Sequence, residues 1–133
     1  MGVYLHNKEY HMEMGYFSFH SLRNLIANIY NYDLFEIYKK LDKCHTEDEF
    51  KAFDDEMNTY LETAKLDDDI IEFLFLPDTE GSISYKTCGK LYKIIKDYTS
   101  DIRFGYVNTN NTFEYFKEML LDCKKKKRKL YWD

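Results

Sequence analysis

The stretch LPDTEGSISYKT contains the residue types and spacing that come nearest to a metal site. An EF-hand loop places oxygen ligands at positions 1, 3, 5, 7, 9 and 12, with glycine at position 6. With Gly81 at position 6, Asp78 and Glu80 take positions 3 and 5. Position 1 is then a leucine and position 12 a threonine, so both ends that clamp the ion lack a carboxylate. The sequence predicts a tight glycine turn before a helix, without a bound metal. Asp78 and Glu80 are the candidate ligands that this stretch offers.

Three histidines offer a second place for a metal. His6, His11 and His20 accompany Glu9 and Glu13 in the first part of the chain, and imidazole with carboxylate is a common set of zinc ligands. Their spacing matches no helical metal pair such as HExxH. A small metal-dependent enzyme or metal-binding domain, built on these histidines or on the acidic turn, is therefore the alternative function. We expect no cofactor.

The cysteines do not indicate nucleophilic chemistry. Cys44 is followed by His45, and side chains that are adjacent in sequence usually point apart, which argues against a thiolate with its base. Cys88 and Cys123 are far apart in sequence and no CxxC is present, so we expect reduced thiols. The GxxxxGK, GxGxxG and GxSxG motifs of nucleotide-binding proteins and hydrolases are absent. The sequence favours a non-catalytic protein.

Carboxylates gather in three short groups, EDE at 47–49, DDE at 54–56 and DDD at 67–69. On the outer face of a helix, such groups could imitate a phosphate backbone and occupy a basic groove of another protein. The alternative is an ordinary solvated surface with acids near helix starts. The candidate protein-binding residues are Asp54, Asp55, Glu56, Asp67, Asp68 and Asp69.

Charge is divided unevenly along the chain. Residues 1–123 hold 13 basic and 23 acidic side chains, a formal −10, and the basic residues of the remainder are concentrated in KKKKRK at 124–129. An acidic body repels nucleic acid and anionic membrane surfaces. We therefore expect direct nucleic-acid binding only through residues 124–129.

Neither a membrane span nor an export signal is found. The longest apolar run, IIEFLFL at 70–76, is far shorter than the roughly 20 residues that a span requires. The N-terminus lacks a basic segment followed by an apolar one, and neither end fits a lipidation motif. We expect a protein of the bacterial host cytoplasm without membrane association.

Capping residues and apolar spacing predict a mainly α-helical, α+β fold, a compact domain of five or six helices. The clearest helix begins after Thr46, because Glu49 completes a capping box ahead of regularly spaced apolar residues. VYLH at 3–6 and KLYW at 129–132 have the β-branched and aromatic content of short strands, and we expect them to pair. Residues 7–16 are expected to be irregular.

The other helices are each predicted from a cap, an acidic first turn or a run of apolar residues. They are a helix over about 19–30 capped by Ser18, one capped by Asp33 that runs to about 43, one over 66–76, one over about 85–98 capped by Ser84, and one capped by Asn111. No repeat or linker divides the chain, so 1–133 is predicted to be a single domain, with 124–129 as a basic segment before the final strand.

GYFSFHSLRNLIA at 15–27 and DTEGSISYKTCGKL at 78–91 resemble two segments of a family of short, uncharacterised phage and bacterial proteins that begin with Met-Gly. The residues that match its first segment are Gly15, Ser18, Phe19, Arg23, Ile26 and Ala27. Those that match its second segment, D-x-D-G-x-I-x-x-x-x-C, are Asp78, Gly81, Ile83 and Cys88, with Glu80 in place of the second aspartate. The family has no established activity, so the resemblance implies a phage or mobile-element context and adds no catalytic residue.

The sequence thus predicts a small accessory protein of phage or mobile-element type. It would act without catalysis by binding a host or phage protein, and inhibition by acidic mimicry is one role that suits its composition. Aromatic residues make up 18% of the chain, and they supply anchors of the kind that protein interfaces use. The identity of the partner and the oligomeric state are left open.

Overall fold

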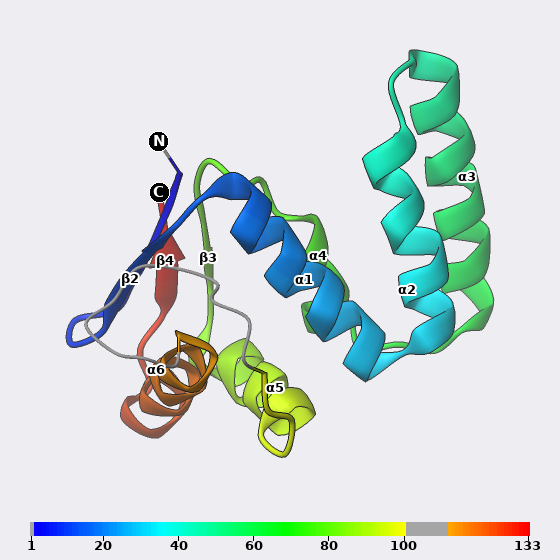
Figure 1. Ribbon diagram of the computed structural model, residues 1–133. Coiled ribbons are helices and arrows are strands. Elements are labelled where there is room, and N and C mark those ends of the chain that lie inside the picture. The colour runs from blue at the N-terminus through cyan, green and yellow to red at the C-terminus, as the bar shows by residue number, and fades with distance from the viewer. Residues whose placement is uncertain (1, 101–111) are drawn as a thin grey trace.

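The structure, a computed structural model, describes residues 2–100 and 112–133 (Figure 1). Its elements follow in the order β1 (Val3–His6), β2 (His11–Met14), α1 (Tyr16–Tyr30), α2 (Tyr32–Tyr38), the 3-10 helix η1 (Lys39–Lys43), α3 (Glu47–Thr63), α4 (Asp68–Phe75), β3 (Gly81–Ile83), α5 (Tyr85–Ile95), α6 (Thr112–Lys126) and β4 (Leu130–Trp132). The predicted mainly helical α+β domain with paired terminal strands is confirmed.

A small antiparallel sheet joins the two ends of the described chain. Its strand order is β2-β1-β4-β3, and Leu5 of β1 lies opposite Trp132 of β4. The prediction that residues 7–16 are irregular was wrong, because β2 pairs with β1. The prediction of a turn at Gly81 was also wrong, because this residue begins β3 and pairs with Trp132. Both strands are short and lie at the sheet edges, where the pairing partner and not the local sequence supplies the hydrogen bonds.

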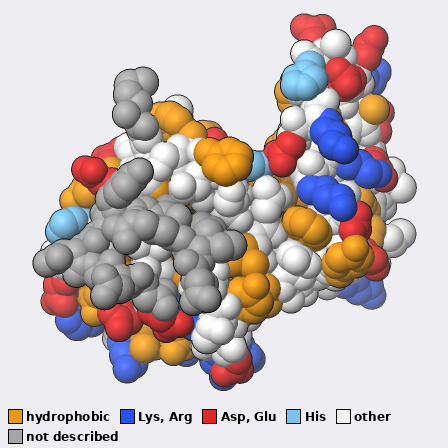
Figure 2. All heavy atoms as spheres, in the orientation of Figure 1, with side chains coloured by type: hydrophobic (Ala, Val, Ile, Leu, Met, Phe, Trp, Pro, Cys, Tyr) orange, Lys and Arg blue, Asp and Glu red, His pale blue; other side chains and the backbone are white. Residues whose placement is uncertain are grey.

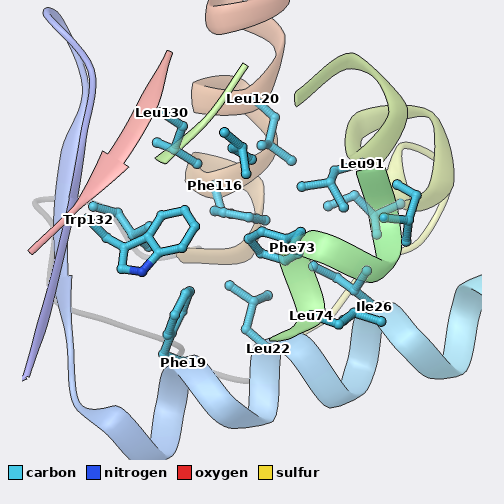
Figure 3. Packing of buried hydrophobic residues seen from close by; sticks show 14 of the residues in the cluster. Phe19, Leu22, Ile26, Phe73, Leu74, Leu91, Phe116, Leu120, Leu130 and Trp132 are labelled. Carbon is cyan, nitrogen blue, oxygen red and sulfur yellow. The ribbon is translucent and has the colours of Figure 1, made fainter. Parts of the chain in front are cut away.

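One face of the sheet forms a wall of the core. In β1, β2 and β4, buried residues alternate with more exposed ones, as expected when only one face is covered. Figure 3 shows Leu130 and Trp132 pointing from β4 toward Phe19, Phe73 and other residues of the helices. The opposite face of the sheet is left without a covering helix among the described elements.

Local capping signals fix several helix starts. Thr46 and Glu49 form the predicted capping box of α3, and the Ser84 hydroxyl accepts a hydrogen bond from the amide of Thr87 at 3.3 Å. The predicted caps at Ser18 and Asp33 were wrong. The helix α1 begins after Gly15, and Asn31 caps α2 by accepting a hydrogen bond from the amide of Leu34. The predicted cap at Asn111 lies outside the described residues.

In both incorrect cases the helix begins earlier than predicted. The chain passes from β2 into α1 with only Gly15 between them, so the first turn forms before the serine is reached. Asn31 follows the end of α1 directly, and its amide oxygen satisfies a free amide of the next helix. A cap chosen from sequence alone can therefore be displaced by the way a neighbouring element ends.

The elements α2, η1 and α3 form a helical hairpin, residues 32–63, which we call the arm. Figure 1 shows the arm standing away from the sheet and from α5 and α6. Tyr38 anchors it, because this side chain is buried and its hydroxyl donates to the carbonyl oxygen of Leu74 at 2.8 Å. Phe75 adds ring contacts to Tyr38 and Phe53, with centroids 5.4 and 6.5 Å away. The arm is thus attached at the end of α4, and it also contacts α1, where His20 pairs with Asp42.

None of the helices in residues 2–100 and 112–133 combines the length and the apolar character that crossing a membrane would take.

Candidate functional site

The predicted metal candidate Asp78 is engaged by a buried arginine. Its Oδ1 lies 3.2 Å from the Nη1 of Arg23, which also donates to the carbonyl oxygen of Leu76 at 2.7 Å. Arg23 is only 3% exposed, and its guanidinium lies 4.2 Å from the ring centre of Phe19. Burial lowers the pKa of Arg23, and nearby Tyr38 and Asp78 act in the opposite direction. The two segments that carry the family resemblance therefore meet here as a packing cluster.

Glu80, the second metal candidate, is exposed and forms no ion pair with the described residues. Gly81 beside it has a negative φ, as do the other described glycines, so the left-handed turn of a calcium loop is absent here. The spacing of acid, glycine and isoleucine is explained by the ion pair of Asp78 and by the strand that follows it. Among residues 2–100 and 112–133, no three His, Cys, Asp or Glu side chains come close enough to hold a metal ion.

The three candidate histidines do not converge. His6 and His11 face each other across β1 and β2, and Nε2 of His6 lies 3.6 Å from a carboxylate oxygen of Asp133. His20 lies on α1 and is paired with Asp42 of η1. His6 and His11 thus lie together on the sheet, whereas His20 lies where the arm meets α1.

All three thiols are free. Cys44 is half-buried, and its Sγ donates to the carbonyl oxygens of Lys40 and Glu49 at 3.4 and 3.6 Å. Burial and nearby acids raise its pKa. Cys88 and Cys123 are both buried; a hydrogen bond to Cys123 and burial raise the pKa of Cys88.

The acidic group at 67–69 is largely used inside the molecule. Asp67 caps α4, with Oδ1 accepting from the amide of Asp69 at 2.9 Å. The Nζ of Lys90 lies 3.0 Å from Asp67 and 2.7 Å from Asp69. The hydrogen bond from Lys90 is the main cause of the lowered pKa of Asp67. Asp68 alone of this group is exposed without an ion pair to a described residue.

The group at 54–56 is more available. Glu56 pairs with Lys40 of η1 at 2.9 Å, but Asp54 and Asp55 are exposed on α3 and form no ion pair with the described residues. The whole of α3 carries seven acidic residues and one lysine. Phe50, one turn before Asp54, is 43% exposed. A large apolar side chain therefore lies beside unpaired carboxylates on the arm.

Two acidic lines run along the outer side of α3, with members seven residues apart and thus about two helical turns from one another. They consist of Glu47 and Asp54, and of Asp48, Asp55 and Glu62. Figure 2 shows acidic side chains at the free end of the arm. We call this exposed side of the helix the acidic face.

Sequence reasoning missed a second surface, the uncovered face of the sheet. His6 stacks between two tyrosines: its ring centre lies 5.0 Å from that of Tyr4 and 5.7 Å from that of Tyr131, at interplanar angles of 24° and 18°. His11 lies beside Tyr4, with ring centres 6.1 Å apart. Exposed and buried residues alternate along these strands, and this pattern in the sequence could have indicated an exposed face of a sheet. It could not show which residues of different strands lie side by side.

Comparisons with protein-family models, with curated proteins and with solved structures find no match for this chain. The resemblance to short phage and bacterial proteins accordingly stays a prediction from sequence.

Proposed function

We propose that this protein acts without catalysis, by binding a basic surface of a partner protein through the acidic face of α3. The observation that carries the proposal is the position of Asp54 and Asp55, which are exposed, unpaired with any described residue and borne by the projecting arm. Carboxylates used for internal stability would be expected to have partners, as Asp67 has in Lys90.

The arm has the form that insertion into a groove requires. Its helices contact the body through Tyr38 and, farther along, through the pair of Asp42 with His20. Most of the side chains of α3 are exposed, with Phe53 and Met57 as its buried residues. An amphipathic helix that has only a few buried residues has unused surface on both flanks. Phe50 supplies an aromatic anchor beside Asp54, and interfaces often combine such an anchor with surrounding charge.

The charge pattern indicates the chemistry of the partner. Exposed carboxylates of one sign attract a basic protein surface over a distance and speed the encounter, and this attraction weakens as salt screens it. A basic groove that normally holds nucleic acid is one such surface, which is why we include inhibition by mimicry in the proposal. The phage or mobile-element setting and the host cytoplasm, with a host or phage protein as the partner, belong to the proposal and rest on the sequence resemblance and composition.

The test compares charge reversals at two places. Immobilised protein is exposed to a bacterial host lysate, either as wild type, as Asp54→Lys with Asp55→Lys, or as Asp97→Lys with Glu118→Lys. The last variant changes the net charge equally at exposed positions of the α5–α6 region. We expect the wild type and the control to retain the same partner and the α3 variant to lose it. Phe50→Ala should weaken capture about tenfold, the cost of one interface anchor.

Circular dichroism of the variants must show the wild-type helix content before capture is compared. If the α3 variant retains every protein that the wild type captures at about 150 mM salt, where exposed charges act over about 8 Å, the acidic face is a solvated surface and the proposal fails. The metal-dependent alternative has no site in the described residues that favours it.

A further inference from the structure

The stack of rings on the uncovered face of the sheet ends beside an open space. Tyr131 is 45% exposed, and on the side away from His6 its strand pairs with β3, where Ser82 is its partner. Because serine is small, a hollow of about 400 Å³ opens there, and Tyr131 and Ser82 line it together with the acids Glu80 and Asp133. The phenol ring therefore adjoins a space that a planar group can enter.

A second hollow, of about 460 Å³, adjoins the first, and both are lined by His6 and Tyr131. Its other walls include Lys8, Lys127 and Lys129. None of these three lysines forms an ion pair with a described residue, whereas their neighbour Lys126 is paired with Glu9 and Asp122. The hollow is thus positively charged in a protein whose formal net charge is −5.

Lys127 occupies a backbone position that favours glycine. Its φ is 54°, the value of the left-handed residue that ends many helices. The amide of Arg128 donates to the carbonyl oxygen of Cys123 at 3.0 Å, which completes this helix ending. A side chain with a β-carbon at such a position costs about 1 kcal/mol relative to glycine. A binding role for the charge of Lys127 would explain why a lysine stands at a position where glycine would be more stable.

We propose that this face of the sheet binds single-stranded nucleic acid. A base stacks on Tyr131 in the first hollow, and the adjoining phosphates bind Lys127, Lys129 and Lys8 in the second. Exposed aromatic rings on a sheet beside a basic groove are the two components that recognition of unpaired nucleotides requires. Glu80 and Asp133 line the first hollow and not the second, so the uncharged base is expected in the first hollow and the phosphates at the lysine end. A duplex does not fit, because its base faces are already stacked on one another.

Residues 124–129 are the segment through which the sequence predicted any nucleic-acid binding. In the structure this basic segment adjoins the aromatic surface of the sheet. The proposal is independent of the acidic face, because it involves the sheet and the end of α6 and not the arm. RNA and DNA share the bases and phosphates that it requires, so both must be tested.

The experiment measures the fluorescence anisotropy of labelled oligo(U) and oligo(dT) of about twelve nucleotides, and of a duplex of the same length. We expect the full chain to bind one or both single strands more tightly than the duplex, and the affinity to fall between about 50 and about 200 mM salt. Tyr131→Thr keeps a strand-forming residue and should weaken binding about 10- to 100-fold, whereas Tyr131→Phe should not.

The most discriminating variant is Lys127→Gly. It should raise the melting temperature, because glycine suits this backbone conformation. It should also weaken binding and lower the slope of log affinity against log salt concentration by about one, because one phosphate contact is lost. Lys51→Gln, on the arm, is the matched control for loss of one positive charge and should bind as the wild type does. The proposal is overturned if no single strand binds at about 50 mM salt, if the duplex binds equally well, or if Tyr131→Thr and Lys127→Gly bind as the control does.

Discussion

The indole ring of Trp132 lies against the backbone of Gly81, in the space that a β-carbon on this residue would fill. Its Cε2 and Nε1 lie 2.6 and 2.9 Å from the position of such an atom. The ring cannot easily withdraw, because Nε1 donates to the carbonyl oxygen of Pro77 at 2.8 Å and the ring packs against Phe19 and Phe73. Close packing, and not the turn of a metal loop, is therefore the reason for glycine at this position.

The first prediction compares two glycines. Gly81→Ala should lower the free energy of unfolding by about 1–3 kcal/mol, the usual cost of overpacking a core. Gly89→Ala should raise it by up to about 1 kcal/mol, because alanine favours the helix and the new β-carbon meets only the flexible side chain of Lys124. Urea unfolding of both variants tests this, and a neutral Gly81→Ala would show that Trp132 is free to move.

The second prediction concerns calcium and the acidic turn. Calcium at about 1 mM should leave the melting temperature unchanged, whereas a calcium-binding protein would gain about 2.7 kcal/mol at a hundredfold excess over its Kd. Asp78→Ala should cost about 1–3 kcal/mol with or without the ion, because it removes a charged partner of buried Arg23. Glu80→Ala, at an exposed residue, is the control and should have little effect. A calcium-dependent rise that Asp78→Ala abolishes would restore the metal interpretation.

The third prediction concerns high pH. Burial raises the pKa of Tyr38 from 10.0 to about 12, so the unfolded chain loses this proton at a lower pH than the folded protein does. The contribution of this group to the free energy of unfolding is fully present below pH 10 and is lost as the pH rises toward about 12. The free energy of unfolding should fall by about 2–3 kcal/mol over this range. Tyr38→Phe should be less stable near neutral pH, because the carbonyl of Leu74 loses its donor, but should lose less further stability above pH 10.

Urea unfolding at about pH 9 and about pH 11, repeated on wild type and variant, measures this difference. The remaining tyrosines are common to both proteins, so their titration cancels in the comparison. Equal losses of stability in the two proteins would show that Tyr38 titrates at its ordinary pKa when folded.

The fourth prediction is a pattern of thiol reactivity. Cys44 is half-buried on the arm, so it should react with a thiol reagent in the native protein, slowly because its pKa is raised. Cys88 and Cys123 are fully buried and should react only after denaturation. Cys44→Ser should therefore leave no thiol that reacts in the folded state. Rapid reaction of a second thiol would mean that the contact between α5 and α6 opens readily.

The sequence by itself determined those features whose signals lie within a few residues of one another. The capping box of Thr46 and Glu49 satisfies free amides of its own helix, and the cap at Ser84 does the same, so both could be identified locally. The terminal strands were found from their composition, and their pairing was inferred because each needed a partner. The cap predictions depend on hydrogen bonds inside one element, whereas the pairing of the strands was inferred from the need of each for a partner.

The tertiary structure decided everything that depends on a distant partner. The edge strands β2 and β3 exist because β1 and β4 supply their hydrogen bonds. Asp67 and Asp54 look alike in the sequence, but the fold brings Lys90 to the first and leaves the second exposed. His6 and Tyr131 stack although they lie at opposite ends of the chain. A side chain's charge and shape are fixed locally, but which of its surfaces stays free is set by the segments that the fold places against it.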